Sequence, residues 1–294
     1  MDKMYSNKLI IFLFMLPVSV LFLFFVPIPV AFLFIVSFFK WDMLSPLQFV
    51  GFQNYVNLFT TDSYFGIAIK NNMIWLVLGM LIQLVPAFIL AIILHSNMKG
   101  RDFFRSVIFM PMAMSSTAVS MIWYFVYHQK IGVLNQLIRA AGFNDFDYAW
   151  LMDERIALYA VLLVVGWQWA GYYMVLFLAG LSTIPSEISE AATIDGASKW
   201  QVLKNITVPY LIPVFKVTTV LTTVSSFKGF DAVYVMTGGG PGKSTTLLAL
   251  HMFDMSFVRG LYGYGSSVAV IIMLLCIFSS LVLNKIFERN SMEG

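Results

Sequence analysis

Six long apolar runs constrain this chain more than any other feature of its sequence. A helix that crosses a bilayer needs about 20 consecutive, mostly apolar residues. The six runs cover about residues 9–36, 73–94, 106–127, 156–181, 212–235 and 266–284. Only 11% of the 294 residues are charged, whereas soluble domains carry about 25%. We therefore expect an all-α polytopic membrane protein, a single membrane domain over residues 1–294 with six transmembrane helices.

The first run, residues 9–36, has the flanks of a signal peptide but not its length. Lys3 and Lys8 resemble a positively charged n-region, yet the apolar stretch is too long and no small-residue cleavage site follows it. We expect a retained span. Three prolines within the run favour a kink or an early end; they are Pro17, Pro27 and Pro29.

The direction of the spans follows from the distribution of Lys and Arg. If the N-terminus lies inside, the inner segments hold nine basic residues: Lys3, Lys8, Lys99, Arg101, Arg105, Lys199, Lys204, Lys285 and Arg289. The outer segments hold eight: Lys40, Lys70, Lys130, Arg139, Arg155, Lys228, Lys243 and Arg259. The short loop 95–105 is the strongest single indicator, and it favours cytoplasmic N- and C-termini.

The connection between the fourth and fifth runs predicts two short helices joined by a glycine turn. Pro185 suits a helix start, and Glu187 and Glu190 follow in the first turns, where the helix dipole favours acids. Gly196 ends this helix as a left-handed residue would. Ser198 and its neighbours then have capping-box spacing for a second helix, over about 199–206, which stops near proline 209.

Two uses of this hairpin remain open from the residues alone. A helix lying on lipid prefers Lys or Arg opposite bulky apolar side chains. The first helix is instead acidic and rich in small residues, among them Ala191, Ala192 and Ala197. Such a surface favours close approach by another protein over an interfacial position on the bilayer.

The string EAATIDGASKWQVLKNITVP, residues 190–209, strongly resembles the EAA motif of ABC importer permeases. The matching residues are Glu190, Ala191, Ala192, Gly196, Ile206, Val208 and Pro209, with Val208 where leucine is usual. Other stretches resemble the carbohydrate-type branch, which includes maltose, multiple-sugar and glycerol-3-phosphate permeases. They are residues 49–55, 101–105 with Pro111, 132–135 and 237–242.

This resemblance implies a non-catalytic permease subunit of an ATP-driven, binding-protein-dependent importer of a sugar or oligosaccharide, in a bacterial or archaeal inner membrane. Hairpin 186–209 would be the cytoplasmic coupling element. Its implied contacts to the ATPase are Glu190, Ala191, Ala192, Asp195, Gly196 and Ala197. The implied partners are a second homologous permease, an ATP-binding subunit dimer that holds ATP and Mg, an extracytoplasmic solute-binding protein and membrane lipid. No cofactor, metal or nucleic acid is expected on this chain.

Polar groups within the fourth and fifth runs indicate where a substrate passes, because such groups usually face protein or a water-filled cavity. Aromatic faces beside hydroxyl and amide groups suit sugars. Thr222, Ser226 and Gly229 follow helical spacing and share one expected face. The expected pathway residues are Trp169, Tyr172, Thr222, Ser225, Ser226 and Gly229. The alternative is that the hydroxyls bond their own helix backbone.

Two other function classes are weighed against the importer. Residues 240–245 suggest a phosphate loop, but the first glycine of that pattern falls on Thr237. We expect an ordinary external turn there. An intramembrane protease needs a serine or aspartate motif that is absent, and no histidine lies within a run. A stand-alone secondary transporter usually needs more spans or intramembrane charges.

Overall fold

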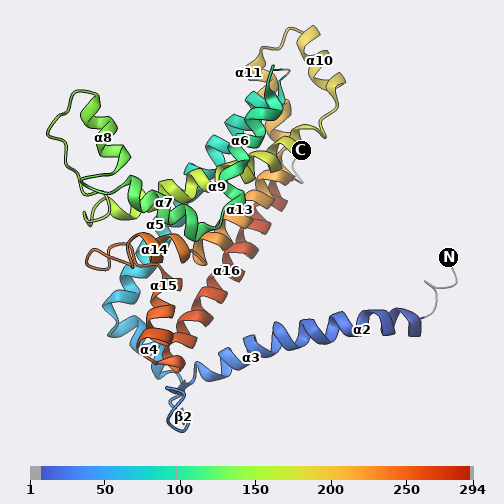
Figure 1. The fold of residues 1–294 in the computed structure, drawn as a ribbon. Coiled ribbons are helices and arrows are strands. Elements are labelled where there is room, and N and C mark those ends of the chain that lie inside the picture. The colour runs from blue at the N-terminus through green and yellow to red at the C-terminus, as the bar shows by residue number, and fades with distance from the viewer. Residues whose placement is uncertain (1–7, 97, 292–294) are drawn as a thin grey trace. The chain divides into compact units, whose positions relative to one another are not determined.

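The computed structural model describes residues 8–96 and 98–291, which are almost entirely helical (Figure 1). The expectation for Lys3 lies outside these residues. In chain order the elements are α2 (Lys8–Phe25), α3 (Pro27–Val36), β1 (Phe39–Lys40), β2 (Gln48–Phe49), α4 (Gln53–Thr60), α5 (Ser63–His95), α6 (Arg101–Ala113), α7 (Ser116–Val126), α8 (Val133–Ala140), α9 (Ala157–Leu181), α10 (Ser186–Ile194), α11 (Lys199–Val202), π-helix η1 (Leu203–Thr207), α12 (Val208–Tyr210), α13 (Ile212–Phe227), α14 (Asp231–Met236), α15 (Leu248–Phe253), π-helix η2 (Asp254–Val258) and α16 (Tyr262–Ser291).

The apolar runs become membrane-length helices, as the sequence predicts. Four helices are long and apolar enough to cross a bilayer: Ile11–Val36, Ser63–His95, Ala157–Leu181 and Tyr262–Glu288. Two bent pairs, α6 with α7 and Lys199–Tyr210 with α13, raise the number in the described residues to as many as six if each pair counts as one span. The all-α membrane fold is confirmed. The second span begins ten residues earlier than expected, at Ser63 rather than 73.

The third predicted span, 106–127, is wrong as one straight helix. The axes of α6 and α7 differ by 97°. Met114 is extended, with a ψ of 150°, and the Ser115 side chain accepts a hydrogen bond from the Ala118 N–H. A serine that caps in this way begins a new helix, so the chain turns where its apolar character continues.

The fifth predicted span, 212–235, also breaks. Helix α13 ends at Phe227, and the short helix α14 starts only at Asp231. Gly229 therefore lies between helices and not on a helical face with Thr222 and Ser226. The backbone N–H groups of Lys228 and Gly229 bond back only three residues, to Ser225 and Ser226, which tightens and closes the last turn.

The predicted hairpin is confirmed in its first helix, its turn and its cap. Gly196 has a φ of +85°, in the left-handed region that glycine enters without steric cost. Ser198 and Gln201 make both hydrogen bonds of a capping box. The second helix ends at Tyr210, next to Pro209, as expected, and is longer than the predicted 199–206. A π-helical turn over Leu203–Thr207 widens the backbone just before this proline and accommodates its ring.

The described chain forms two compact units. The first holds residues 8–62 and 252–271 and the second holds 63–251 and 272–291; the expected single domain stays a prediction. In the first unit, β1 pairs antiparallel with β2. Asn54 Nδ2 donates to the carbonyls of Ser37 and Phe39, and the Tyr264 hydroxyl donates to the Asp62 carboxylate at 2.8 Å.

In the second unit, α9 is the central helix. It packs along α5 and α6 and also contacts α13. Within its most apolar window 61% of residues are buried, compared with 28% for α5. Three of its glycines, Gly166, Gly171 and Gly180, face α5, α6 and the start of α13 respectively. Small residues let helices in a membrane approach closely, so α9 organises this bundle.

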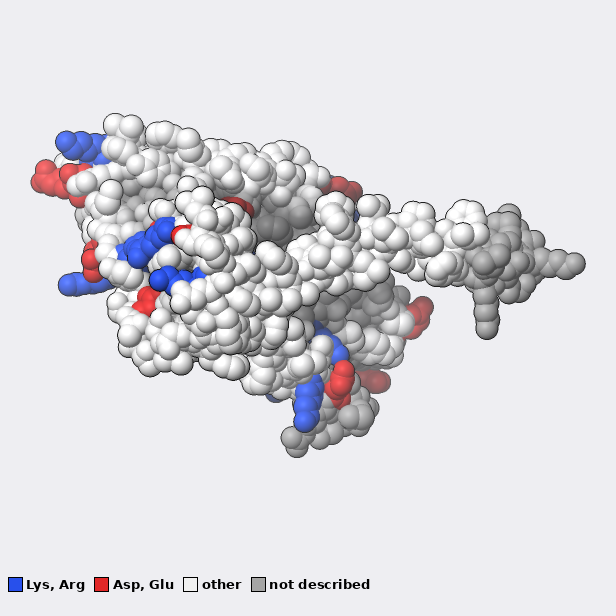
Figure 2. All heavy atoms as spheres, turned by 90° about the horizontal axis from the view of Figure 1, so that it is seen from below, with Lys and Arg blue, Asp and Glu red and all other residues white. Residues whose placement is uncertain are grey.

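Charged side chains are sparse on the molecular surface. Figure 2 shows one face on which most atoms belong to uncharged residues, with Lys, Arg, Asp and Glu gathered in a few places. Large apolar side chains such as Phe14 and Val77 are well exposed. In a water-soluble protein such a surface would be an aggregation hazard, whereas in a bilayer it faces lipid.

Candidate functional site

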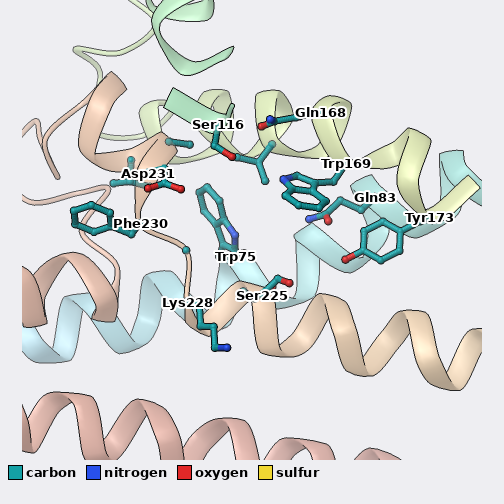
Figure 3. Close-up of a pocket in the computed structure, with 15 residues that line it drawn as sticks. Trp75, Gln83, Ser116, Gln168, Trp169, Tyr173, Ser225, Lys228, Phe230 and Asp231 are labelled. Atoms are coloured by element: carbon teal, nitrogen blue, oxygen red, sulfur yellow. The ribbon is translucent and has the colours of Figure 1, made fainter. Parts of the chain in front are cut away.

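A cavity of about 220 Å³ lies in the second unit where the two broken helices meet (Figure 3). Its lining comes from α5, α9, the end of α13, the connection 228–230, and the first residues of α7 and α14. The lining residues are Trp75, Gln83, Ser116, Val165, Gln168, Trp169, Tyr173, Ser225, Ser226, Lys228, Gly229, Phe230, Asp231, Ala232 and Val233. Irregular backbone at membrane depth occurs where it is buried in protein or lines a cavity.

Aromatic rings and primary amides dominate the lining. Trp75 from α5 and Trp169 and Tyr173 from α9 present their rings, and Gln83 and Gln168 present amides (Figure 3). Gln168 is only 2% exposed, and its Nε2 donates to the Met114 carbonyl at 3.3 Å. This bond attaches α9 to the break between α6 and α7, so one side chain both lines the cavity and supports its wall.

The lining contains one basic and one acidic side chain. Asp231 begins α14, and Lys228 follows the end of α13 with its side chain turned away from the Trp75 indole (Figure 3). Lys216, near the start of α13, lies outside the lining, and its Nζ is 3.2 Å from a carboxylate oxygen of Glu288. The cavity therefore lacks a concentrated positive charge.

Four of the six expected pathway residues line the cavity: Trp169, Ser225, Ser226 and Gly229. The other two do not. Tyr172 packs edge-on against Trp169, with ring centroids 5.9 Å apart. Thr222 is fully buried, and its hydroxyl donates to the Thr218 carbonyl at 2.8 Å. The alternative of backbone-bonded hydroxyls thus describes Thr222, and also Ser226, which donates to the Thr222 carbonyl.

The sequence reasoning missed the contribution of α5. Trp75 and Gln83 line the cavity from this helix, and two consecutive asparagines, Asn71 and Asn72, are buried beside it. The available signal was polar side chains inside an apolar run. Such residues are costly in a membrane and mark functional or structural contacts.

Asn71 and Asn72 connect the segment 226–248 of this unit to α5. Asn71 Nδ2 donates to the carbonyls of Ser244 and Thr246 at 2.8 and 2.9 Å. Asn72 Nδ2 donates to the Ser226 carbonyl at 2.9 Å, and its Oδ1 accepts from the Leu248 N–H at 2.7 Å. One amide thereby joins the end of α13 to the start of α15.

The glycine-rich segment 237–247 is a loop between α14 and α15, which confirms the expected turn; its external position stays a prediction. Hydrogen bonds from its own side chains stabilise this loop. The hydroxyls of Thr237 and Thr245 are 2.7 Å apart, and the Thr246 hydroxyl donates to the Gly239 carbonyl. Thr245 and Thr246 are both buried. With the Asn71 bonds, these contacts favour one conformation.

The connection from α7 to α9 is organised around Asn135. This side chain is 1% exposed; its Nδ2 donates to the carbonyls of Gln129 and Tyr148, and its Oδ1 accepts from Trp150 Nε1. The Tyr148 hydroxyl donates to the Asp153 carboxylate and lowers the pKa of that carboxyl below its ordinary 3.8. This contact adds stability above pH 3.8 and loses it as the pH falls through the lowered pKa.

The hairpin α10–α11 and helix α8 lie at opposite ends of α9 (Figure 1). No residue of α10 is buried. Glu190 and Asp195 are exposed, and so are two large apolar side chains beside the glycine turn, Ile194 at 86% and Trp200 at 69%. Exposed aromatic and aliphatic side chains beside charges fit a protein contact. The coupling roles of these residues stay predictions.

A polytopic helical bundle with a cavity at two helix breaks and an exposed hairpin at one end defines a transport protein of the permease class. Residues 83–292 match the family described as binding-protein-dependent transport system inner membrane component. This match covers more than half of the chain. The chain belongs to that family and is an ABC transporter permease.

Relatives of known sequence agree along most of the chain. It is 36% identical over 291 residues, 98% of its length and 99% of the relative's, to a probable ABC transporter permease protein, YurN, of Bacillus subtilis. It is 33% identical to the multiple sugar-binding transport system permease protein MsmF of Streptococcus mutans, with 86% of each chain covered. To the trehalose/maltose transport system permease protein MalF of Thermococcus litoralis it is 30% identical, covering 82% and 81%.

The fold also matches a solved structure. A chain of a bacterial ABC transporter involved in the import of the acidic polysaccharide alginate superposes with a TM-score of 0.84, covering 96% of both chains at 20% identity. At this identity the likeness supports the fold and not the substrate.

Proposed function

We propose that this permease carries a neutral sugar or oligosaccharide into the cell as part of an ATP-driven importer. The observation that carries the proposal is the cavity where the broken helices meet, which combines four aromatic residues with two amides and hydroxyls. Sugars present apolar C–H faces that stack on rings and hydroxyls that need dispersed hydrogen bonds. Relatives named for multiple-sugar and trehalose/maltose transport support this substrate class.

A neutral substrate is favoured by the charges of the lining. Lys228 and Asp231 are its two charged members, of opposite sign. An anionic saccharide would gain from a cationic passage, yet Lys216 is next to Glu288 instead. The alginate importer shares the fold at 20% identity, so its acidic substrate does not extend to this chain.

The proposed assembly has further chains. The exposed hairpin around Gly196 would dock into a cleft on an ATP-hydrolysing subunit, which binds ATP and Mg and moves the hairpin as a lever in a two-state transition. The permease itself would be non-catalytic and without a cofactor. One permease has one hairpin, whereas an ATPase dimer has two clefts, so a second homologous permease is required.

A solute-binding protein would deliver the sugar from outside. The solved alginate transporter is in complex with a periplasmic protein that holds an alginate pentasaccharide, which supports such a partner here. In this arrangement hairpin 186–209 and both termini face the cytoplasm of a bacterial or archaeal cell, and segments 127–156 and 237–247 face outward.

The first test is copurification of the tagged chain from its native membrane in mild detergent. We expect an ATPase and a second permease to be recovered with it, and Glu190→Lys to reduce ATPase recovery at least about tenfold, since reversing a charge in an interface costs several kcal/mol. Glu187→Lys, on the exposed first turn of the same helix, is the matched control and should retain the ATPase.

Recovery of the chain alone, under conditions that preserve known transporter complexes, would contradict the importer assignment and favour a self-sufficient transporter or an enzyme. Equal loss of the ATPase with both substitutions would leave the importer assignment standing and would contradict only the particular role of Glu190 in docking.

A second prediction concerns the cavity. Trp169→Leu should lower sugar uptake by about tenfold, because loss of an aromatic contact removes roughly 0.5–1.5 kcal/mol beyond its buried area. Trp167→Leu is the control, since Trp167 is exposed outside the lining. Uptake of a panel of radiolabelled sugars into vesicles, with the expression level of each variant measured, checks this. Equal losses for both variants would remove Trp169 from the pathway.

A further inference from the structure

A second cavity, of about 460 Å³, lies beneath the hairpin in the same compact unit. It is bounded by the last turns of α5 and α9, by α10, and by the helix that runs from α11 into η1. The lining residues are Ile92, His95, Leu181, Ser189, Thr193, Ala197, Lys199, Trp200, Val202, Leu203 and Thr207. It shares no residue with the cavity at the helix breaks.

The depth of this cavity is set by the spans that border it. His95 and Leu181 are the final residues of two helices that qualify as membrane spans, Ser63–His95 and Ala157–Leu181. A site at the ends of two spans lies at the boundary between hydrocarbon and water, where lipid headgroups reside. Trp200 lines the same cavity, and tryptophan is enriched at this level of a membrane.

The lining combines two kinds of side chain. Lys199 supplies a positive charge and His95 an imidazole, and Ser189, Thr193 and Thr207 add hydroxyl groups. The Thr193 hydroxyl already donates to the Ser189 carbonyl at 2.8 Å. None of the lining residues is Asp or Glu, although Glu187, Glu190 and Asp195 belong to the same hairpin. The apolar lining residues include Ile92, Leu181 and Leu203.

We propose that this cavity binds an anionic phospholipid, with the phosphate near Lys199 and His95 and an acyl chain along Ile92 and Leu203. Basic pockets between membrane helices at a bilayer surface recognise anionic headgroups. Inorganic phosphate shares the anionic chemistry, but it would leave the apolar lining residues uncovered. The acidic residues that the proposed ATPase would contact, Glu190 and Asp195, lie outside this lining, and Ala197 is the one proposed coupling residue within it.

A lipid at this position has a mechanical consequence, which rests on the proposed function. The cavity lies between the hairpin and the spans it would move, so a bound lipid would stiffen that connection. Lipid composition would then change how strongly a movement of the hairpin is coupled to movements of α9 and α13. The binding itself does not depend on any ATPase or substrate.

The binding test uses the purified full-length chain in detergent with phosphatidylglycerol or phosphatidylcholine, and native mass spectrometry of the retained lipid. We expect a preference for phosphatidylglycerol that falls about fivefold for Lys199→Gln, as expected for loss of one cation near an anionic surface. His95→Gln should lower this preference by a smaller factor, because it removes no permanent charge. Lys199→Arg should restore the preference. Lys204→Gln, an exposed cation of the same helix outside the lining, should leave it unchanged.

Three outcomes would overturn the proposal. Equal retention of the two lipids would remove the charge recognition. An equal effect of Lys204→Gln would mean diffuse attraction to the surface. Displacement of phosphatidylglycerol by millimolar inorganic phosphate would mean an anion site without a lipid chain. Because His95 and Lys199 are both exposed, their variants should fold, and a thermal melt of each confirms this independently of the importer assignment.

Discussion

Gly171→Ala is expected to destabilise the membrane bundle by about 3 kcal/mol, near the upper end of the usual cost of overpacking. A methyl group at this position would lie 2.2 Å from the Ile108 carbonyl oxygen and 2.9 Å from Phe109 Cα. Both atoms belong to the backbone of α6, so no side-chain rotation relieves the contact. The helices α6 and α9 would have to separate, and the bond from Gln168 to Met114 would stretch with them.

The effect is measured as a change in the melting temperature in detergent, with the amount of monodisperse protein that remains after heating as the readout. Gly66→Ala is the matched control, because it is also a glycine inside a helix but its added methyl would meet nothing within 4 Å. That control should be neutral or stabilising by about 0.5–1 kcal/mol, the usual gain of alanine over glycine in a helix. Similar melting curves for both variants would refute the close approach of α6 and α9.

Asn72→Ala is expected to cost about 3 kcal/mol and to abolish uptake even where the protein remains folded. The change leaves the Leu248 N–H without its acceptor at a fully buried position, and a buried unsatisfied group costs about 1–3 kcal/mol. The Ser226 carbonyl would lose its bond from the Asn72 side chain and keep only local backbone bonds, from the N–H groups of Lys228 and Gly229. Ser226 lines the cavity, so the end of α13 would lose its position there.

Asn205→Ala provides the control, since Asn205 is exposed in the helix after the hairpin turn. It should change the melting temperature little, because exposed substitutions are usually within about 0.5 kcal/mol of neutral. Melting temperature and vesicle uptake are measured for both variants. If Asn72→Ala retained the uptake rate and stability of the parent, the hydrogen bonds of Asn72 to α13 and α15 would not contribute to function.

The two helix breaks explain where prediction from pattern failed. Apolar runs measure how much chain is at membrane depth, and they did not reveal that 106–127 turns by 97° at Ser115. They also did not reveal that α13 ends at Phe227. There the Asn72 side chain, from a helix far away in the sequence, donates a hydrogen bond to the Ser226 carbonyl. The transfer of apolar side chains into lipid is equally favourable whether the helix is straight or bent. Hydropathy alone therefore carries no information about the break.

The residues of the candidate cavity were also predicted only in part from the sequence. Some lining residues were recognisable from the sequence, because aromatic and hydroxyl side chains are unusual in the middle of a span: Trp169, Ser225 and Ser226. Gly229 was recognisable as a small residue next to them. Trp75 and Gln83 come from α5, far away in the chain, and only packing brings them to the same cavity. Tyr172 and Thr222 have the right chemistry but lie outside the lining, because the rotation of each helix is set by its neighbours.

The sequence by itself determined the membrane class and the hairpin, since these depend on local properties: apolar length, the capping box at Ser198 and the left-handed freedom of Gly196. Only the tertiary structure decided the broken spans, the cavity between them and the second cavity beneath the hairpin. These depend on contacts between residues far apart in the chain, such as Asn72 with Leu248 and Gly171 with Ile108, which no local pattern encodes.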